Sequence, residues 1–205
     1  HRAHLQGCRG SSDHCGGRIR DDERDVEMPR VADNASCGVY VLGDARADPR
    51  AHDLPGLHVT VTLGWLAERY PVMVRSIVSA GHELASHGQS HERASAQSPD
   101  LFREDVLRAK SVLEDLTGSP VLGYRAPSFS IDTRTPWAHQ VLAEAGYAYS
   151  SSVAPLAHDH YGWAEAPRFA YHPVVGSTLL EMPVTTVRVG GRRMAAGGGG
   201  FFRVL

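Results

Sequence analysis

Cysteine is scarce in this sequence, and charge of neither sign is in excess. The 205 residues contain three cysteines, none later than Cys37, and a sparse, odd set of this kind does not predict a disulfide framework. The formal net charge is −2, so the composition predicts neither a nucleic-acid nor an anionic-membrane partner. No apolar run approaches the roughly 20 residues that a membrane-spanning helix needs, so we expect no transmembrane segment in these residues.

The amino terminus also lacks the pattern of a secretory signal. Residues 1–5 read His-Arg-Ala-His-Leu, without a charged start followed by an apolar core. Taken by itself, this absence predicts a cytoplasmic location. Because the chain does not begin with Met, a leader encoded upstream stays open as the alternative.

What the sequence does contain changes in character near residue 58. Hydrophobic residues make up 42% and charged residues 21% of the chain, which is ordinary globular usage. Residues 1–58 scatter Gly, Arg, Asp and His with little apolar periodicity, so we expect an atypical or disordered amino-terminal segment there. Residues 59–205 predict one folded domain. Its last apolar run, 201–205, has no element to complete it, so we expect this domain to be truncated.

Strands and helices alternate along this second part. A β-branched strand ends at Gly64, a helix begins at Pro71, and a short strand leads into His87. Ser98, followed by Pro and Asp, predicts a capped helix start, and apolar residues at steps of four and three continue that helix to Gly118. Further elements are expected as a strand over 121–126, a helix over 136–146, and strands over 147–153 and 179–184. This alternation predicts a parallel sheet or barrel.

Two histidines four residues apart follow the short strand over 83–86. His87 and His91 enclose Gly-Gln-Ser, and imidazoles at this spacing can bind one divalent ion from a helix face or a tight loop. Sheet and barrel enzymes carry their reactive groups at the carboxyl ends of strands. Because the spacing itself is common, a solvated loop without metal is the alternative.

The surroundings of these histidines resemble a known family. Ala80–His91 resembles the metal-binding motif of the nodulation-type polysaccharide deacetylases, carbohydrate esterase family four. Tyr124–Phe129 resembles the family's Arg-x-Pro motif, and Thr62–Pro71 its second strand and following helix. The resemblance covers residues 62–205. Two later segments, 180–186 and 197–203, resemble in particular the deacetylases associated with exosortase and exopolysaccharide loci.

The resemblance implies a fold and a set of site residues. The fold is an α/β, distorted (β/α) barrel of the polysaccharide deacetylase type, here expected to be incomplete at both ends. His87 and His91 match the two histidines that hold a zinc-like ion, and Arg125 matches the arginine that orients the catalytic carboxylate. Pro127 lines the substrate groove. Glu181 belongs to the later motif and is expected to contact substrate as well.

The implied chemistry is hydrolysis of acetamido groups on an N-acetylated polysaccharide or oligosaccharide, with release of acetate. A divalent ion, expected to be zinc, held by two neutral imidazoles and one carboxylate lowers the pKa of a bound water toward ~7. The same ion polarises the acetamide carbonyl. A second carboxylate accepts the proton of the water, and an acid protonates the leaving amine.

The family's first motif, an early strand whose two aspartates act as base and third metal ligand, is missing here. The nearest fragment, Asp25–Glu27, lacks an apolar strand before it and the family's continuation after it. We hypothesise that the segment upstream of Thr62 is out of frame or mis-assembled, which translation of the coding DNA in its other frames would show. The base and the proton donor stay unassigned. Other carboxylates and histidines that come into question are Asp33, Asp44, Asp48, Asp53, His158, His160 and His172.

Three functions therefore remain open. The first is an active metal-dependent deacetylase. The second is a catalytically inactive deacetylase-like fragment that at most binds carbohydrate. The aromatic side chains that come into question for such binding are Trp65, Trp137, Tyr161 and Trp163, of which Trp137 is expected to pack in the core instead. The third is a small-amide hydrolase of the same fold, which a substrate screen separates from the first.

Overall fold

The computed structural model describes residues 18–21, 24–27, 39–44, 58–158 and 161–196. The chain divides into two compact units, residues 1–38 and 39–205, and each is described by itself. In the first unit, β1 (Arg18–Asp21) and β2 (Arg24–Glu27) pair as an antiparallel hairpin. The fragment Asp25–Glu27 lies in β2 of this hairpin.

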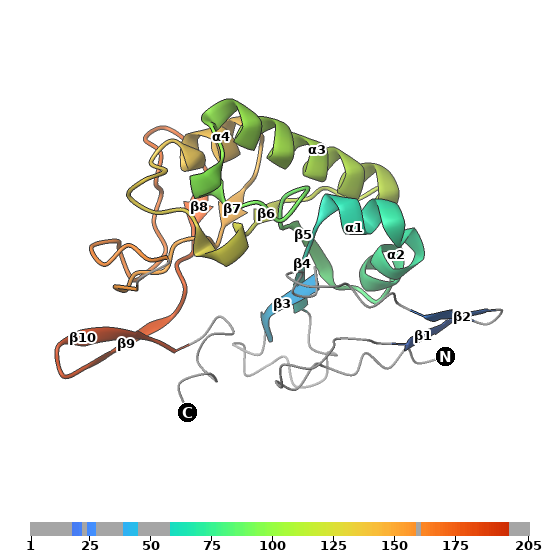
Figure 1. Ribbon diagram of the computed structural model, residues 1–205, viewed down its shortest axis with the longest axis horizontal. Coiled ribbons are helices and arrows are strands. Elements are labelled where there is room, and N and C mark those ends of the chain that lie inside the picture. Colours follow the sequence, from blue (N-terminus) through green and yellow to red (C-terminus); the bar gives the residue numbers. More distant parts are fainter. Residues whose placement is uncertain (1–17, 22–23, 28–38, 45–57, 159–160, 197–205) are drawn as a thin grey trace. The chain divides into compact units, whose positions relative to one another are not determined.

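The second unit is built on a six-stranded sheet with the strand order β3-β4-β5-β6-β7-β8 (Figure 1). Its strands are β3 (Val39–Asp44), β4 (His58–Thr62), β5 (Glu83–Ser86), β6 (Gly123–Tyr124), β7 (Tyr149–Ser150) and β8 (Leu180–Glu181). Strands β4 to β8 are parallel, whereas β3 pairs antiparallel with β4. The α/β fold with a parallel sheet predicted from the sequence is confirmed.

Four α-helices accompany these strands in the described part of the chain. They are α1 (Gly64–Arg69), α2 (Pro71–Ser79), α3 (Pro99–Thr117) and α4 (Ala138–Glu144). Figure 1 shows α3 as the longest of them, running from the neighbourhood of α4 to that of α1 and α2. None of the described helices combines the length and the apolar character that crossing a membrane requires.

Helix α3 begins and ends where the sequence predicts. The hydroxyl of Ser98 accepts a hydrogen bond from the backbone N–H of Leu101, and Gly118 ends the helix in the left-handed conformation, with φ +66°. The apolar face packs into the core: Phe102, Val106, Ala109 and Leu113 are completely buried. This packing makes α3 a firm support for any polar group that projects from it toward the sheet.

The carboxyl-terminal part of the unit is less regular than predicted. Strands were expected over 147–153 and 179–184, but β7 and β8 each contain two residues. The loop after β7 is fixed by hydrogen bonds to side chains instead of by strand pairing. Such bonds cannot be predicted from the apolar pattern of the sequence. A hairpin of β9 (Thr186–Val189) and β10 (Arg192–Ala195) follows.

Candidate active site

His87 and His91 lie in the loop that follows β5, at the carboxyl end of the parallel sheet. His87 is buried, and its backbone N–H donates to the carbonyl of Thr62 at 2.9 Å. The ring centroids of the two histidines are 5.0 Å apart, in an edge-on arrangement. The structure therefore brings the two predicted metal ligands together.

A backbone carbonyl fixes the orientation of the first imidazole. Nδ1 of His87 lies 2.7 Å from the carbonyl oxygen of Arg125. Because a carbonyl oxygen can only accept, Nδ1 carries the proton and Nε2 carries the lone pair. Metal-binding histidines are commonly held in this way, by a hydrogen bond from the ring nitrogen that does not bind the ion.

Both histidines are neutral at neutral pH. Burial lowers the pKa of His87 to about 4, against the opposing effect of the hydrogen bond to Arg125. Burial and then the positive charge of Arg93 lower the pKa of His91. Neutral imidazole is the form that binds a metal ion, so the pair is in the required state without proton release.

Arg125 has its side chain directed to the loop after β7. Its Nε donates to the carbonyl of Ser151 at 2.9 Å and its Nη2 to the Ser151 hydroxyl at 2.8 Å. Its guanidinium also lies 5.2 Å from the ring centroid of Phe129. Burial lowers the pKa of Arg125 to about 10, so the group stays charged at neutral pH. Its predicted task of orienting a base carboxylate stays a prediction.

The backbone beside Arg125 is strained. Pro127 is buried and begins a short 3₁₀ turn, Pro127–Phe129. Within that turn, Ser128 and Phe129 have φ values of +56° and +50°, and His91 has +60°. These three are the non-glycine residues with positive φ among those that the structure describes. Each costs roughly 1–2 kcal/mol, and such strain concentrates at functional sites. The predicted contact of Pro127 with substrate is untested.

Glu181 lies on β8 and is completely buried. Its Oε1 accepts hydrogen bonds from the backbone N–H groups of Ser152 (2.8 Å) and Val153 (2.9 Å), and its Oε2 is 3.1 Å from Nε2 of His139. Burial raises the pKa of Glu181, but the hydrogen bond and charge of His139, with the other bonds, lower it below its usual value. The carboxylate thus orders the loop that carries Ser151. Its predicted contact with substrate stays a prediction, and its burial gives that role no support.

The other candidate carboxylates and histidines are distributed along the chain, and among them His172 bonds through Nδ1 to the carbonyl oxygen of Leu179. Asp44 pairs in register with His58, at the opposite end of β4 from the site, and the Asp25–Glu27 fragment belongs to the first unit. His158 stacks on Tyr161, with centroids 4.1 Å apart. Four predicted candidates lie outside the described residues: Asp33, Asp48, Asp53 and His160.

The two imidazoles of His87 and His91 can occupy two of the coordination positions of one zinc-like ion. Within the described ranges, no group of three or more His, Cys, Asp or Glu side chains is arranged to hold a metal ion. Trp65 is half-buried at the start of α1, beside the histidine loop, whereas Trp137 packs against the main core.

Sequence reasoning missed one polar group beside the histidines. Asp105 on α3 accepts hydrogen bonds from the backbone of the loop between them. Asp105 precedes the buried Val106 in the amphipathic pattern of α3. An acidic residue on the buried side of a helix is the feature from which its role could have been predicted. Phe102, three residues earlier on the same helix face, was predicted as a core residue.

The polysaccharide deacetylase family model matches residues 56–150, and a model described as a domain of unknown function, DUF3473, matches residues 151–205. Residues 56–150 belong to the polysaccharide deacetylase family. The resemblance inferred from the histidine and arginine motifs is therefore confirmed at the level of the family, and the exosortase-associated branch stays a prediction.

Named relatives are similar to part of this chain and are deacetylases by name. A peptidoglycan deacetylase of Helicobacter pylori is 31% identical over 90 residues, which are 44% of this chain and 30% of that protein. A peptidoglycan-N-acetylglucosamine deacetylase of Bacillus cereus is 29% identical over 117 residues, 57% of this chain and 49% of that protein. The chain thus spans from about a third to half of the length of these relatives.

A solved structure supports the fold. The crystal structure described as a polysaccharide deacetylase from Mycobacterium smegmatis is 30% identical to this chain, with a TM-score of 0.51. The match covers 70% of this chain and 47% of that one. The deacetylase-type α/β fold with a parallel sheet is therefore shown, and an incomplete barrel is consistent with this match.

Proposed function

We propose that this polysaccharide deacetylase domain hydrolyses acetamido groups of an N-acetylated polysaccharide in a zinc-dependent reaction that releases acetate. The observation that carries the proposal is the pair of neutral imidazoles of His87 and His91 on one loop at the carboxyl end of the sheet. The fixed Nδ1 of His87 leaves Nε2 as the metal-binding atom.

The chain's own groups have separate tasks in this reaction. His87 and His91 would hold the ion, and the ion would supply an acidified water and polarise the acetamide carbonyl. The main chain of Arg125 orients His87, while its guanidinium keeps a positive charge beside the site at neutral pH. That charge is suited to hold a carboxylate or to stabilise negative charge that develops during hydrolysis.

The substrate proposal rests on the relatives. The Helicobacter pylori and Bacillus cereus proteins are named for peptidoglycan and for its N-acetylglucosamine. A glycan with N-acetylated amino sugars is therefore the substrate class that we propose here, with an exopolysaccharide as the finer expectation from the later motifs. The cytoplasmic location stays a prediction.

One observation favours the inactive alternative. In the described structure, the Arg125 guanidinium is hydrogen-bonded to Ser151, whereas the family's arginine orients a carboxylate. A domain without the base carboxylate would bind carbohydrate at most. The small-amide hydrolase has no comparable observation in its favour.

Zinc titration calorimetry and acetate release test the proposal together. We expect the purified chain to bind one zinc ion, to lose that binding in His87→Ala and His91→Ala, and to release acetate from N-acetylglucosamine oligomers. His172→Ala is the matched control for zinc binding alone, because His172 is exposed and its Nδ1 bonds to the carbonyl of Leu179. Zinc binding without acetate release from any N-acetylated glycan would leave the inactive alternative, and absence of zinc binding would contradict the metal site.

A further inference from the structure

The loop between the two histidines is held by backbone hydrogen bonds from one side. The backbone N–H of Gly64 donates to the carbonyl of Gly88 at 3.0 Å, and that of Trp65 donates to the carbonyl of Gln89 at 3.2 Å. These two donors lie at the amino terminus of α1, where helix N–H groups have no partner within the helix. Two carbonyl groups of the loop, those of Gly88 and Gln89, are therefore satisfied by α1.

Two N–H groups of the same loop, those of Gln89 and Ser90, are satisfied by one carboxylate on α3. Oδ2 of Asp105 accepts from the backbone N–H of Gln89 at 3.0 Å, and Oδ1 accepts from that of Ser90 at 3.3 Å. Both oxygens of one side chain thus bind consecutive N–H groups between His87 and His91. A hydrogen bond to a charged acceptor is stronger than one between neutral groups.

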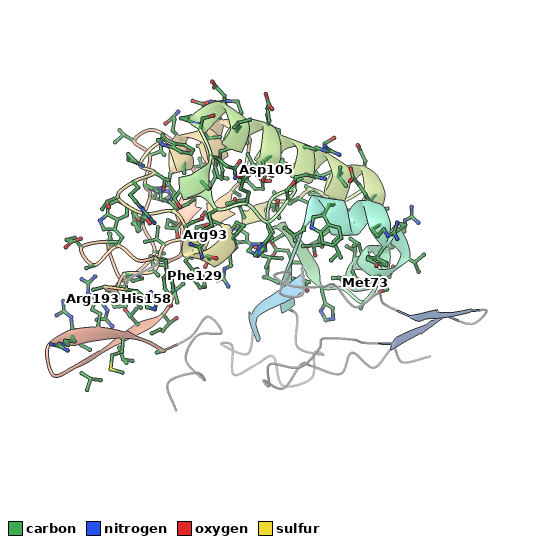
Figure 2. The ribbon with its side chains drawn as sticks, in the orientation of Figure 1. Met73, Arg93, Asp105, Phe129, His158 and Arg193 are labelled. Atoms are coloured by element: carbon green, nitrogen blue, oxygen red, sulfur yellow. The ribbon has the colours of Figure 1, made fainter. Side chains whose placement is uncertain are left out.

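Asp105 is well placed to hold this loop because its own helix is rigidly packed. It lies on α3 (Figure 2), on the stretch of the helix that also carries the completely buried Phe102, Val106 and Ala109. A functional group is positioned best by side chains whose supports are themselves fixed by packing. The position of the loop is therefore tied to the core.

Glycine at position 88 allows the close approach of the carboxylate. Gly88 has φ +82°, and a Cβ atom built on it would lie 2.6 Å from Oδ2 of Asp105. A side chain at this position would strain the backbone and push the carboxylate away. The conformation of the loop and the place of Asp105 are thus matched to each other.

We propose that Asp105 is a positioning residue of the metal site, which fixes the His87–His91 loop in the geometry that binds the ion. The inference rests on the proposed zinc site. Without the carboxylate, two loop N–H groups lose their acceptor, and the two imidazoles must be ordered when the ion binds. Residues that orient metal ligands typically account for about 10-fold to 100-fold in metal affinity.

The test compares Asp105→Asn with the matched control Asp115→Asn in the full chain. Asp115 lies on the same helix, is exposed, and accepts a hydrogen bond from Ser111. Asn at position 105 keeps the size of the side chain but offers one acceptor and turns an NH₂ group toward a backbone N–H. We expect zinc affinity, measured by calorimetry, to fall about 10-fold to 100-fold in Asp105→Asn and to stay unchanged in Asp115→Asn.

A second readout does not require metal. In the metal-free chain, amide exchange of Gln89 and Ser90, followed by NMR, should accelerate in Asp105→Asn while exchange within α3 does not. If Asp105→Asn does not fold, Asp105→Glu provides the test, since it retains both acceptor oxygens and should retain more zinc affinity than Asp105→Ala.

The outcomes separate the two proposals. Unchanged zinc affinity and unchanged exchange in a folded Asp105→Asn chain would overturn the positioning role and leave the zinc site intact. If the unmutated chain binds no zinc, the zinc site is refuted. In that case faster exchange at Gln89 and Ser90 would still show that Asp105 orders the loop, although not for a metal.

Discussion

At the scale of single residues, the histidine loop depends on a backbone conformation that glycine alone adopts without strain. Gly88 has φ +82° and faces the carboxylate of Asp105. Gly118, at the end of α3, has φ +66°, and no atom lies within 4 Å of the place that a Cβ atom would take there. The two glycines share a left-handed conformation and differ in their surroundings. A substitution at Gly118 therefore measures the free energy of the left-handed conformation alone, whereas one at Gly88 adds the steric conflict with Asp105.

We predict that Gly88→Ala weakens both stability and zinc affinity. The left-handed conformation costs roughly 1–2 kcal/mol for a non-glycine residue, and displacement of Asp105 adds to it. Gly118→Ala should lower stability by roughly 1–2 kcal/mol with no change in zinc affinity. Urea unfolding and zinc titration of both variants check this, and equal zinc affinity in the two would contradict it.

Arg125 offers a second prediction at this scale, because its main chain and side chain act on different partners. The carbonyl that orients His87 is kept in Arg125→Lys, but the paired hydrogen bonds to Ser151 are not, since lysine lacks the planar fork. We expect zinc affinity close to that of the unmutated chain and acetate release lowered about 100-fold. Parallel loss of zinc affinity would show that the side chain also holds the metal loop. Arg103→Lys, at an exposed ion pair with Glu144, is the control.

At the scale of elements, buried polar groups replace regular pairing between β7, β8 and α4. Glu181 connects β8 to His139 on α4 and to two N–H groups of the loop after β7. Ser152 in that loop also accepts from the backbone N–H of Ala126 through its hydroxyl. The short strands are therefore held together by a connected network, and loss of one member leaves the others unsatisfied.

We predict that Glu181→Ala strongly destabilises the unit. Each buried donor left without an acceptor costs about 1–3 kcal/mol, and Glu181 serves two backbone N–H groups besides His139. The control, Glu144→Ala, removes an exposed carboxylate and should behave like the unmutated chain. Urea unfolding compares the variants; similar midpoints would mean that the network contributes little.

The β9–β10 hairpin gives a further prediction at this scale. Nη1 of Arg193 donates toward three carbonyls of the preceding loop, those of Pro155, Ala164 and Ala166, at 3.3, 2.6 and 2.9 Å. We expect Arg193→Ala to accelerate amide exchange throughout the hairpin, because this anchor is lost. Arg192→Ala, at the neighbouring exposed position, should leave the exchange rates unchanged, and equal rates in the two variants would contradict the anchoring role.

At the scale of the whole molecule, the periodic elements could be predicted from the sequence and the irregular ones could not. The amphipathic spacing of α3 and its Ser98 cap predicted that helix correctly, and the strand before His87 placed the histidines at the sheet's carboxyl end. Helix α2 begins at Pro71 as predicted, whereas the short α1 directly before it was not predicted from the apolar pattern.

Only those residues of the candidate site that belong to a local sequence motif could be predicted. His87, His91 and Arg125 lie in local patterns, and the structure brings the His87 ring to the Arg125 carbonyl. Asp105 and Ser151 act through contacts between residues far apart in the sequence, which no local spacing encodes. For the same reason, the position of Glu181 in its motif could be read from the sequence, but its burial and its bonds to the loop after β7 could not.

The stability of the whole metal-free chain should fall as pH decreases, starting below pH 6.5. Burial lowers the pKa of His87 to about 4 and also lowers that of His91, so the unfolded chain binds protons that the folded chain does not. At lower pH, Glu181 and Asp132 act in the same direction, because their folded pKa values lie below the usual 4.5 and 3.8. Asp105 opposes them, since burial raises its pKa.

The sign of each contribution leads to a distinct pH profile. Between pH 6.5 and about 4 the slope from His87 approaches about 1.4 kcal/mol per pH unit, and this part should flatten in His87→Gln. Below about pH 4.5 the slope from Glu181 takes over, and this part alone should flatten in Glu181→Gln. Urea unfolding from pH 8 to pH 3 in the presence of a chelator measures both. Constant stability between pH 7 and pH 5 would mean that the histidine loop opens to solvent in the metal-free chain, so that the imidazoles titrate as they do in the unfolded state.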